Sequence, residues 1–137
     1  YALAGLRVGY AVAHPQLIAV MERVRESFNV NALGLAAAEA ALRDVQHLQS
    51  SVAGNTTQRV ALADALRSRD LKVSPSQTNF LLVEFGDDAG RIEAALVSRG
   101  VVLRPMGGYG LGECLRITVG TEAENARLLA VLDEVMA

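Results

Sequence analysis

The sequence has little of what marks several classes of protein. It has one cysteine, Cys114, among 137 residues, so no disulfide can form within the chain, which is usual in a reducing cytoplasm. The formal net charge is −2 and no basic block occurs, which argues against a nucleic-acid or anionic-membrane partner. No apolar run approaches the roughly 20 residues that a helix needs to cross a bilayer. We therefore expect a cytoplasmic protein that binds neither nucleic acid nor membrane.

Residues that commonly bind metals or act as nucleophiles are also scarce. The two histidines, His14 and His47, are far apart in sequence and lack the spacing of metal ligands, so we expect no metal site. Neither histidine is near Cys114, and no partner motif surrounds this cysteine. A nucleophilic or redox role for Cys114 is therefore disfavoured.

The first 45 residues predict a strand and two helices. Apolar residues alternate with small or polar ones over residues 6–12, which is the period of a strand. Pro15 is typical of a first helical turn, and Asn31 is a good cap for a second helix that continues to Leu42. These elements offer little core of their own.

Residues 45–66 predict one long helix, because apolar residues recur at spacings of three and four. Gly54 weakens it by roughly 1 kcal/mol relative to alanine. Asn55 and Arg59 interrupt the apolar stripe, which favours a helix that bridges two domains over a coiled coil. We place the domain boundary near residue 45.

The rest of the chain predicts a compact α/β unit. We expect a final helix after Thr121 and Glu124, because a threonine followed three residues later by glutamate forms a capping box. The other expected elements are a strand at 79–85, a helix at about 88–99 closed by Gly100, and strands at 101–103 and 115–119.

Several motifs resemble, in order, those of fold-type I enzymes that use pyridoxal 5'-phosphate (PLP). Tyr1 to Tyr10 reads Tyr-Ala-Leu-Ala-Gly-Leu-Arg-Val-Gly-Tyr, which is similar to the run Gly-Leu-Ala-Gly-x-Arg-x-Gly-Tyr that follows a Ser-Lys pair in these enzymes. The resemblance continues through residues 28–31, 78–83 and 115–121 with Glu124-Asn125, and the last block is most similar to histidinol-phosphate aminotransferases.

This resemblance implies an α/β fold that is the C-terminal portion of a larger enzyme. Residues 1–45 would be the end of the large PLP-binding domain, and residues 46–137 the bridging helix and the small domain. The lysine that forms the Schiff base would precede Tyr1, so we assign no catalytic residue here and expect the chain alone to be inactive. Family members of this type are usually homodimers.

The resemblance also implies roles for three arginines. It assigns Arg7 to the PLP phosphate, for which a guanidinium can supply two charge-assisted hydrogen bonds, and Gly5 and Gly9 would let the ligand approach. It assigns Arg104 and Arg116 to the substrate's anionic group, a carboxylate in glutamate and a phosphate in histidinol phosphate. Alone, each would be interpreted as an ordinary surface arginine.

The glycine-rich segment 104–114 is a second candidate for phosphate binding. It leads into a strand, whereas phosphate-binding glycine loops lead into a helix N-terminus, so we favour a flexible hairpin connection. Asn29, Asn31 and Asn79 also match the family, and a structural role is favoured for each. Ser27 stands where relatives often have proline, so the local turn can differ.

The expected function is PLP-dependent transamination of histidinol phosphate with 2-oxoglutarate or glutamate, a step of histidine biosynthesis, in the complete protein. The partners would be a small-molecule amino donor and a 2-oxo acid. Aromatic aminotransferases and threonine-phosphate decarboxylases are alternatives on the same scaffold. A non-catalytic α/β interaction module is a third alternative.

Overall fold

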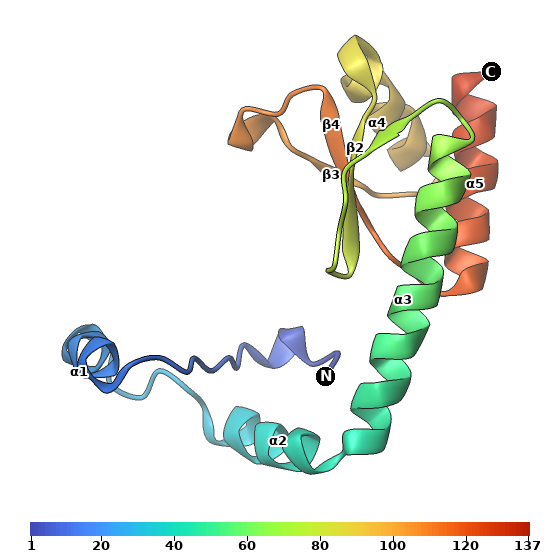
Figure 1. Ribbon diagram of the computed structural model, residues 1–137. Helices are drawn as coiled ribbons and strands as arrows, with labels where there is room; N and C mark the ends of the chain where they lie inside the picture. Colours follow the sequence, from blue (N-terminus) through green and yellow to red (C-terminus); the bar gives the residue numbers. More distant parts are fainter. The chain divides into compact units, whose positions relative to one another are not determined.

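The computed structural model describes all 137 residues, and they form two compact units, Tyr1–Val52 and Ala53–Ala137 (Figure 1). The division falls inside a long helix, α3, which spans Val45–Arg67 as the sequence predicts. The assignment of 1–45 and 46–137 to a large and a small domain stays a prediction. No helix combines the length and the apolar character needed to cross a membrane.

The first unit contains a short 3-10 helix, η1 (Ala4–Leu6), and the helices α1 (Pro15–Val24) and α2 (Ala32–Arg43). Both predicted helix starts are confirmed: Pro15 opens α1, and the Asn31 side chain accepts a 2.7 Å hydrogen bond from the Gly34 amide at the start of α2. Most of the unit's apolar side chains are exposed, Phe28 by 99%. The unit has almost no core of its own, as expected.

The strand predicted over residues 6–12 is wrong for this chain. η1 ends at Leu6, and the residues after it have no regular structure up to α1. A strand is stable only when a neighbouring strand accepts and donates its backbone hydrogen bonds, and no strand of this chain pairs with the segment. Residues 6–12 therefore have the alternating pattern of a strand but belong to no sheet of this chain.

The second unit contains an antiparallel sheet of four strands in the order β1-β2-β4-β3. Three helices lie on one side of this sheet: the C-terminal part of α3, α4 and α5 (Figure 1). The predicted helices and the strands near 80 and 115 are confirmed within a few residues. The elements are β1 (Lys72–Val73), β2 (Phe80–Glu84), η2 (Gly86–Asp88), α4 (Ala89–Ser98), β3 (Arg104–Pro105), η3 (Gly107–Tyr109), β4 (Cys114–Thr118) and α5 (Glu122–Met136).

The two faces of the sheet differ sharply. Leu81, Val83, Leu115 and Ile117 are each at most 1% exposed, because they point into the core formed with the helices. Their alternating neighbours point the other way, where no helix of the unit covers them. We call this side the open face; it carries Phe80, Leu82, Glu84, Arg104, Cys114, Arg116 and Thr118.

The predicted strand at 101–103 is also wrong, since β3 begins only at Arg104. Gly100 closes α4 as predicted, with a positive φ of 75°, and the Val101 amide donates to the Leu96 carbonyl. This helix-ending hydrogen bond holds Val101 close to α4. Strand pairing with β4 therefore starts three residues later, at Arg104. The sequence did not predict β1, because a strand of two residues is too short to show an alternating pattern.

Hydrogen bonds at the start of α5 cap this helix and connect it to α3. The capping box of Thr121 and Glu124 is present, and its hydrogen bonds hold the pKa of Glu124 below its usual range. Asn125, which is buried, donates to Gln58 of α3 and to the Gly120 carbonyl. These contacts fix the start of α5 beside the end of β4.

The polar residues that interrupt the apolar stripe of α3 bind the turn before β2. Arg59 is only 8% exposed, and it donates to the Thr78 carbonyl at 3.2 Å and to Gln77 Oε1 at 3.4 Å. Asn55 donates to the same carbonyl at 3.2 Å. The interruption is therefore a specific contact that positions the start of β2.

We predict that Arg59→Met lowers the free energy of unfolding by about 1–3 kcal/mol, because two hydrogen bonds from a charged, buried donor are lost and the Thr78 carbonyl keeps only its bond from Asn55. The measurement is urea denaturation followed by circular dichroism. Arg67→Met is the matched control, since Arg67 lies on the same helix and only bonds Asp64 at the surface. Equal effects of the two substitutions would contradict the role given to Arg59.

Candidate functional site

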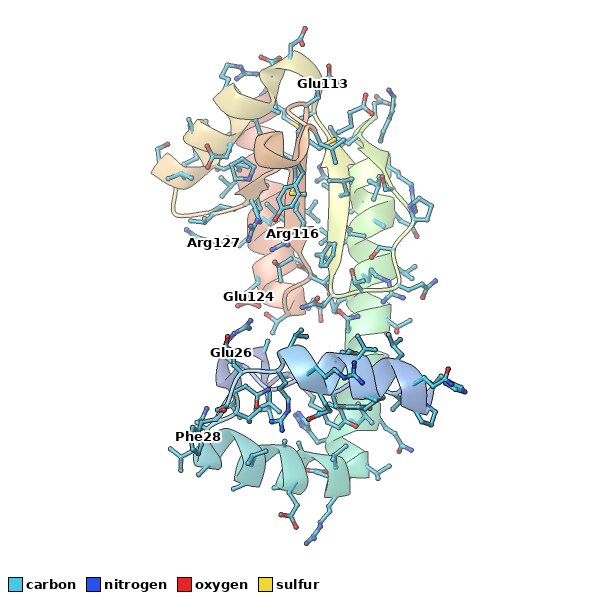
Figure 2. The ribbon with its side chains drawn as sticks, turned by 90° about the vertical axis from the view of Figure 1, so that its left-hand side faces the viewer. Glu26, Phe28, Glu113, Arg116, Glu124 and Arg127 are labelled. Atoms are coloured by element: carbon cyan, nitrogen blue, oxygen red, sulfur yellow. The ribbon has the colours of Figure 1, made fainter.

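The open face brings two of the three predicted site arginines together. Arg104 of β3 is the direct cross-strand partner of Arg116 of β4, so both side chains leave the sheet on the same side. Figure 2 looks onto this face and shows Arg116 near the middle of the sheet. No carboxylate forms a salt bridge with either guanidinium. Like charges directly opposite each other destabilise a sheet, so the pair favours an anion between them.

Arg116 lies against an aromatic ring and has an unused donor. Its guanidinium carbon is 4.9 Å from the centre of the Phe80 ring, a cation–π distance, and Phe80 leaves the same face of β2. Its Nε atom is buried and has no hydrogen-bond partner in the chain. A buried donor without an acceptor costs about 1–3 kcal/mol, so this position suits a ligand that supplies the acceptor.

Arg104 is exposed and contacts Tyr109 of η3. Its Nη2 donates to the Tyr109 hydroxyl at 3.3 Å, and its guanidinium carbon is 5.9 Å from the ring centre. The segment between β3 and β4 turns back at Gly110, whose positive φ of 75° favours glycine. The glycine-rich segment therefore connects two antiparallel strands, as the sequence predicts, and brings Tyr109 to Arg104.

Arg7, the third predicted site arginine, lies in the first unit. It follows η1 with a φ of 56°, and its Nη1 donates to the Ala4 carbonyl at 3.0 Å. Arg7 is exposed, and a Cβ atom added at Gly5 or Gly9 would meet nothing within 4 Å. An exposed guanidinium without an acidic partner, flanked by glycines, fits a phosphate group.

A pocket of about 420 Å³ lies where the pairing of β3 with β4 stops. Its walls are formed by residues 100–103, by residues 117–120 and by the first turns of α5. The pocket borders the open face at Thr118.

Lys72 is the only lysine of the chain, and it is engaged in an ion pair at the edge of the sheet. It lies on the edge strand β1 and donates to Glu84 at 2.7 Å, which raises its pKa. A lysine that attacks a carbonyl must be neutral, and an ion pair favours the charged form. No cluster of three His, Cys, Asp or Glu residues could hold a metal ion.

The remaining candidates have structural partners. His14 caps α1 by accepting from the Gln16 amide, and His47 contacts Ser51 within α3. The Asn79 carbonyl accepts from the Val119 amide at 2.8 Å, and the structural role expected for the Asn79 side chain stays a prediction. Neither Phe80 nor Tyr109 was singled out from the sequence. Phe80 could have been found because it alternates with the core residues of β2 and so lies on the same face as Arg116. Tyr109 could have been found because it follows Arg104 in a glycine-rich turn.

Cys114 lies half-buried on the open face, opposite Glu84 in the sheet. Burial raises the pKa of its thiol, and the negative charges of Glu84 and Glu113 raise the pKa further. The thiolate is the reactive form, so this environment suppresses reactivity and agrees with the expected absence of a nucleophilic role.

We predict that iodoacetamide alkylates Cys114 at pH 8 more slowly than it alkylates a short unstructured peptide with the same flanking residues. Glu84→Gln should speed the reaction severalfold, because it removes a nearby negative charge that disfavours the thiolate. The rate is measured by mass spectrometry. Asp64→Asn, a charge change on α3, should leave it unchanged, and a Cys114 faster than the peptide would contradict the assignment.

The sequence is similar to those of known aminotransferases. The family model described as aminotransferase class I and II matches residues 1–132. The chain is 46% identical to histidinol-phosphate aminotransferase 2 of Ralstonia nicotianae over 140 residues and 48% identical to histidinol-phosphate aminotransferase 1 of Thiobacillus denitrificans over 137 residues. All of this chain is covered, but it spans only 37% and 35% of these two curated relatives.

The structure is also similar to solved structures. Histidinol-phosphate aminotransferase from Sinorhizobium meliloti, solved in complex with pyridoxal-5'-phosphate, superposes with a TM-score of 0.85 at 34% identity. The match covers 99% of this chain and 38% of that chain. The similarity therefore extends over both units described above.

Proposed function

This chain belongs to the class I and II aminotransferase family, and from that premise we propose that the complete protein transfers the amino group of histidinol phosphate to 2-oxoglutarate. Two relatives of 46% and 48% identity carry the name histidinol-phosphate aminotransferase, which supports this substrate. Because the chain spans little more than a third of each, the activity is proposed for the whole protein.

The observation that carries the proposal is the arginine pair on the open face. Arg104 and Arg116 face the same side, lack acidic partners, and leave one buried donor unused. Both the phosphate of the amino donor and the carboxylates of glutamate and 2-oxoglutarate carry the charge that such a pair attracts. The pair would bind the anionic end of each substrate in turn and orient its reacting end.

The proposed cofactor is PLP, and Arg7 would hold its phosphate. The related enzyme from Sinorhizobium meliloti was solved with this cofactor, and Arg7 is exposed and has no acidic partner, which suits a phosphate. When bound, PLP supplies the electron sink that lets an amino group move between two carbon skeletons. The residues of this chain contribute charge and position.

We also propose that the complete protein is a cytoplasmic homodimer acting on small molecules. The exposed apolar side chains of α1 and α2 in the first unit support the proposal of a packing partner, because nothing in that unit covers them. The exposed side chains include Leu17, Val20, Met21, Val24, Leu33, Leu35 and Leu42.

The test is a transamination assay on the complete protein with 2-oxoglutarate and a panel of amino donors. Histidinol phosphate should give the highest kcat/KM, above phenylalanine, and threonine phosphate should not be decarboxylated. Arg116→Gln should lower kcat/KM for histidinol phosphate by about 10²-fold, because a desolvated charge pair is lost. Arg67→Gln on α3 is the control and should change it less than twofold.

The isolated 137-residue chain should show no turnover, since its only lysine is paired with Glu84. Turnover by this chain would refute that part of the proposal. A complete protein that prefers an aromatic donor, decarboxylates threonine phosphate, or turns over no donor would replace the proposed function with one of the three alternatives.

A further inference from the structure

Tyr109 stands beside the arginine pair with its hydroxyl group turned to the guanidinium of Arg104. The Arg104 Nη2 atom donates to the phenol oxygen at 3.3 Å, so the oxygen is the acceptor in this contact. The proton of the hydroxyl has no acceptor in the chain. Tyr109 is 65% exposed, so this proton is available to a ligand that reaches Arg104.

The two aromatic contacts of the open face differ in one respect. Phe80 lies against Arg116 and Tyr109 lies against Arg104, at 4.9 Å and 5.9 Å from the guanidinium carbon to the ring centre. A ring alone is enough to hold a guanidinium by a cation–π contact, as Phe80 does. The hydroxyl group of Tyr109 accepts a hydrogen bond from Arg104 and also brings a donor to the site, which Phe80 does not.

We propose that Tyr109 is a specificity-determining residue that, together with Arg104 and Arg116, makes the open face select a phosphate monoester over a carboxylate. This deepens the proposed function and rests on its assignment of the arginine pair to the substrate anion.

The selection follows from the number of acceptor atoms. A carboxylate offers two oxygens in one plane, which the two guanidinium groups already satisfy. A phosphate monoester offers three terminal oxygens in a tetrahedral arrangement, so one oxygen remains for a third donor. Since Arg104 and Arg116 are adjacent across two strands and Tyr109 touches Arg104, the third donor lies on the same side of the site.

The surrounding charges do not oppose an anion here. The acidic side chain on the open face is that of Glu84, which is engaged by Lys72 at 2.7 Å. Glu113 lies at the far end of β4, away from Arg116 (Figure 2).

The test titrates the full 137-residue chain, labelled with ¹⁵N, with methyl phosphate and separately with acetate, and follows the Nε–H signals of arginine by NMR. Both ligands should shift the signals of Arg104 and Arg116, and methyl phosphate should bind more tightly. Tyr109→Phe should weaken methyl phosphate binding about fivefold and acetate binding less than twofold, because one hydrogen bond to a charged group is lost. The substitution removes no charge and keeps the ring. Each ligand is compared with itself in the wild-type and variant chains, so the difference in charge between the two ligands does not affect the comparison.

Two variants serve as controls. Ser98→Ala removes a hydroxyl that only bonds the Ala95 carbonyl within α4, and it should change neither affinity. Phe80→Leu removes a ring without removing a donor, and it should weaken both ligands by similar factors. An unchanged ratio of the two affinities in Tyr109→Phe, or signals of Arg104 and Arg116 that respond to neither ligand, would overturn the inference.

A second measurement separates the phosphate of the amino donor from that of the cofactor, which is the same chemical group. In the complete protein loaded with PLP, methyl phosphate should inhibit competitively against the phosphorylated amino donor. Absence of competition would assign the site to the cofactor's phosphate and overturn the inference. A complete protein that transaminates no donor refutes the proposed function alone, because the titration of the chain still decides the role of Tyr109.

Discussion

The two-residue period of β2 and β4 is the constraint on which the second unit depends. Leu81, Val83, Leu115 and Ile117 occupy one phase of this period and form the core with three helices. The opposite phase is then obliged to face outward, and it carries Phe80 and Arg116. A slip of one residue would move the arginine into the apolar core and the core residues into solvent, so packing also fixes the position of the site.

Stability and binding capacity therefore come from opposite sides of the same strands. The covered side removes apolar surface from water. The open side holds two guanidinium groups of like charge, and each makes a cation–π contact with an aromatic ring. Such an arrangement gains little for the isolated unit. The proposed anion would give the one buried donor without a partner, Arg116 Nε, an acceptor.

Polar residues on α3 and α5 connect this surface to the helices. Arg59 holds the turn that leads into Phe80, and Asn125 holds the segment that follows β4. Each is buried, and each satisfies backbone carbonyls. The start of β2 and the end of β4, which pair with each other through Phe80 and Thr118, are thus positioned by hydrogen bonds from helices. The first unit, in contrast, has caps and helices but almost no buried side chain.

The sequence by itself determined the helices, their caps and the covered face of the sheet, because these depend on local periodicity and on contacts three or four residues apart. Motif resemblance also led to the family and to Arg7, Arg104 and Arg116. Only the tertiary structure decided that residues 6–12 and 101–103 form no strand, since a strand needs a partner and Val101 is held by α4. It also decided that Arg104 and Arg116 are direct neighbours and that Phe80 and Tyr109 lie against them, because these contacts join residues from different strands whose register no local pattern encodes.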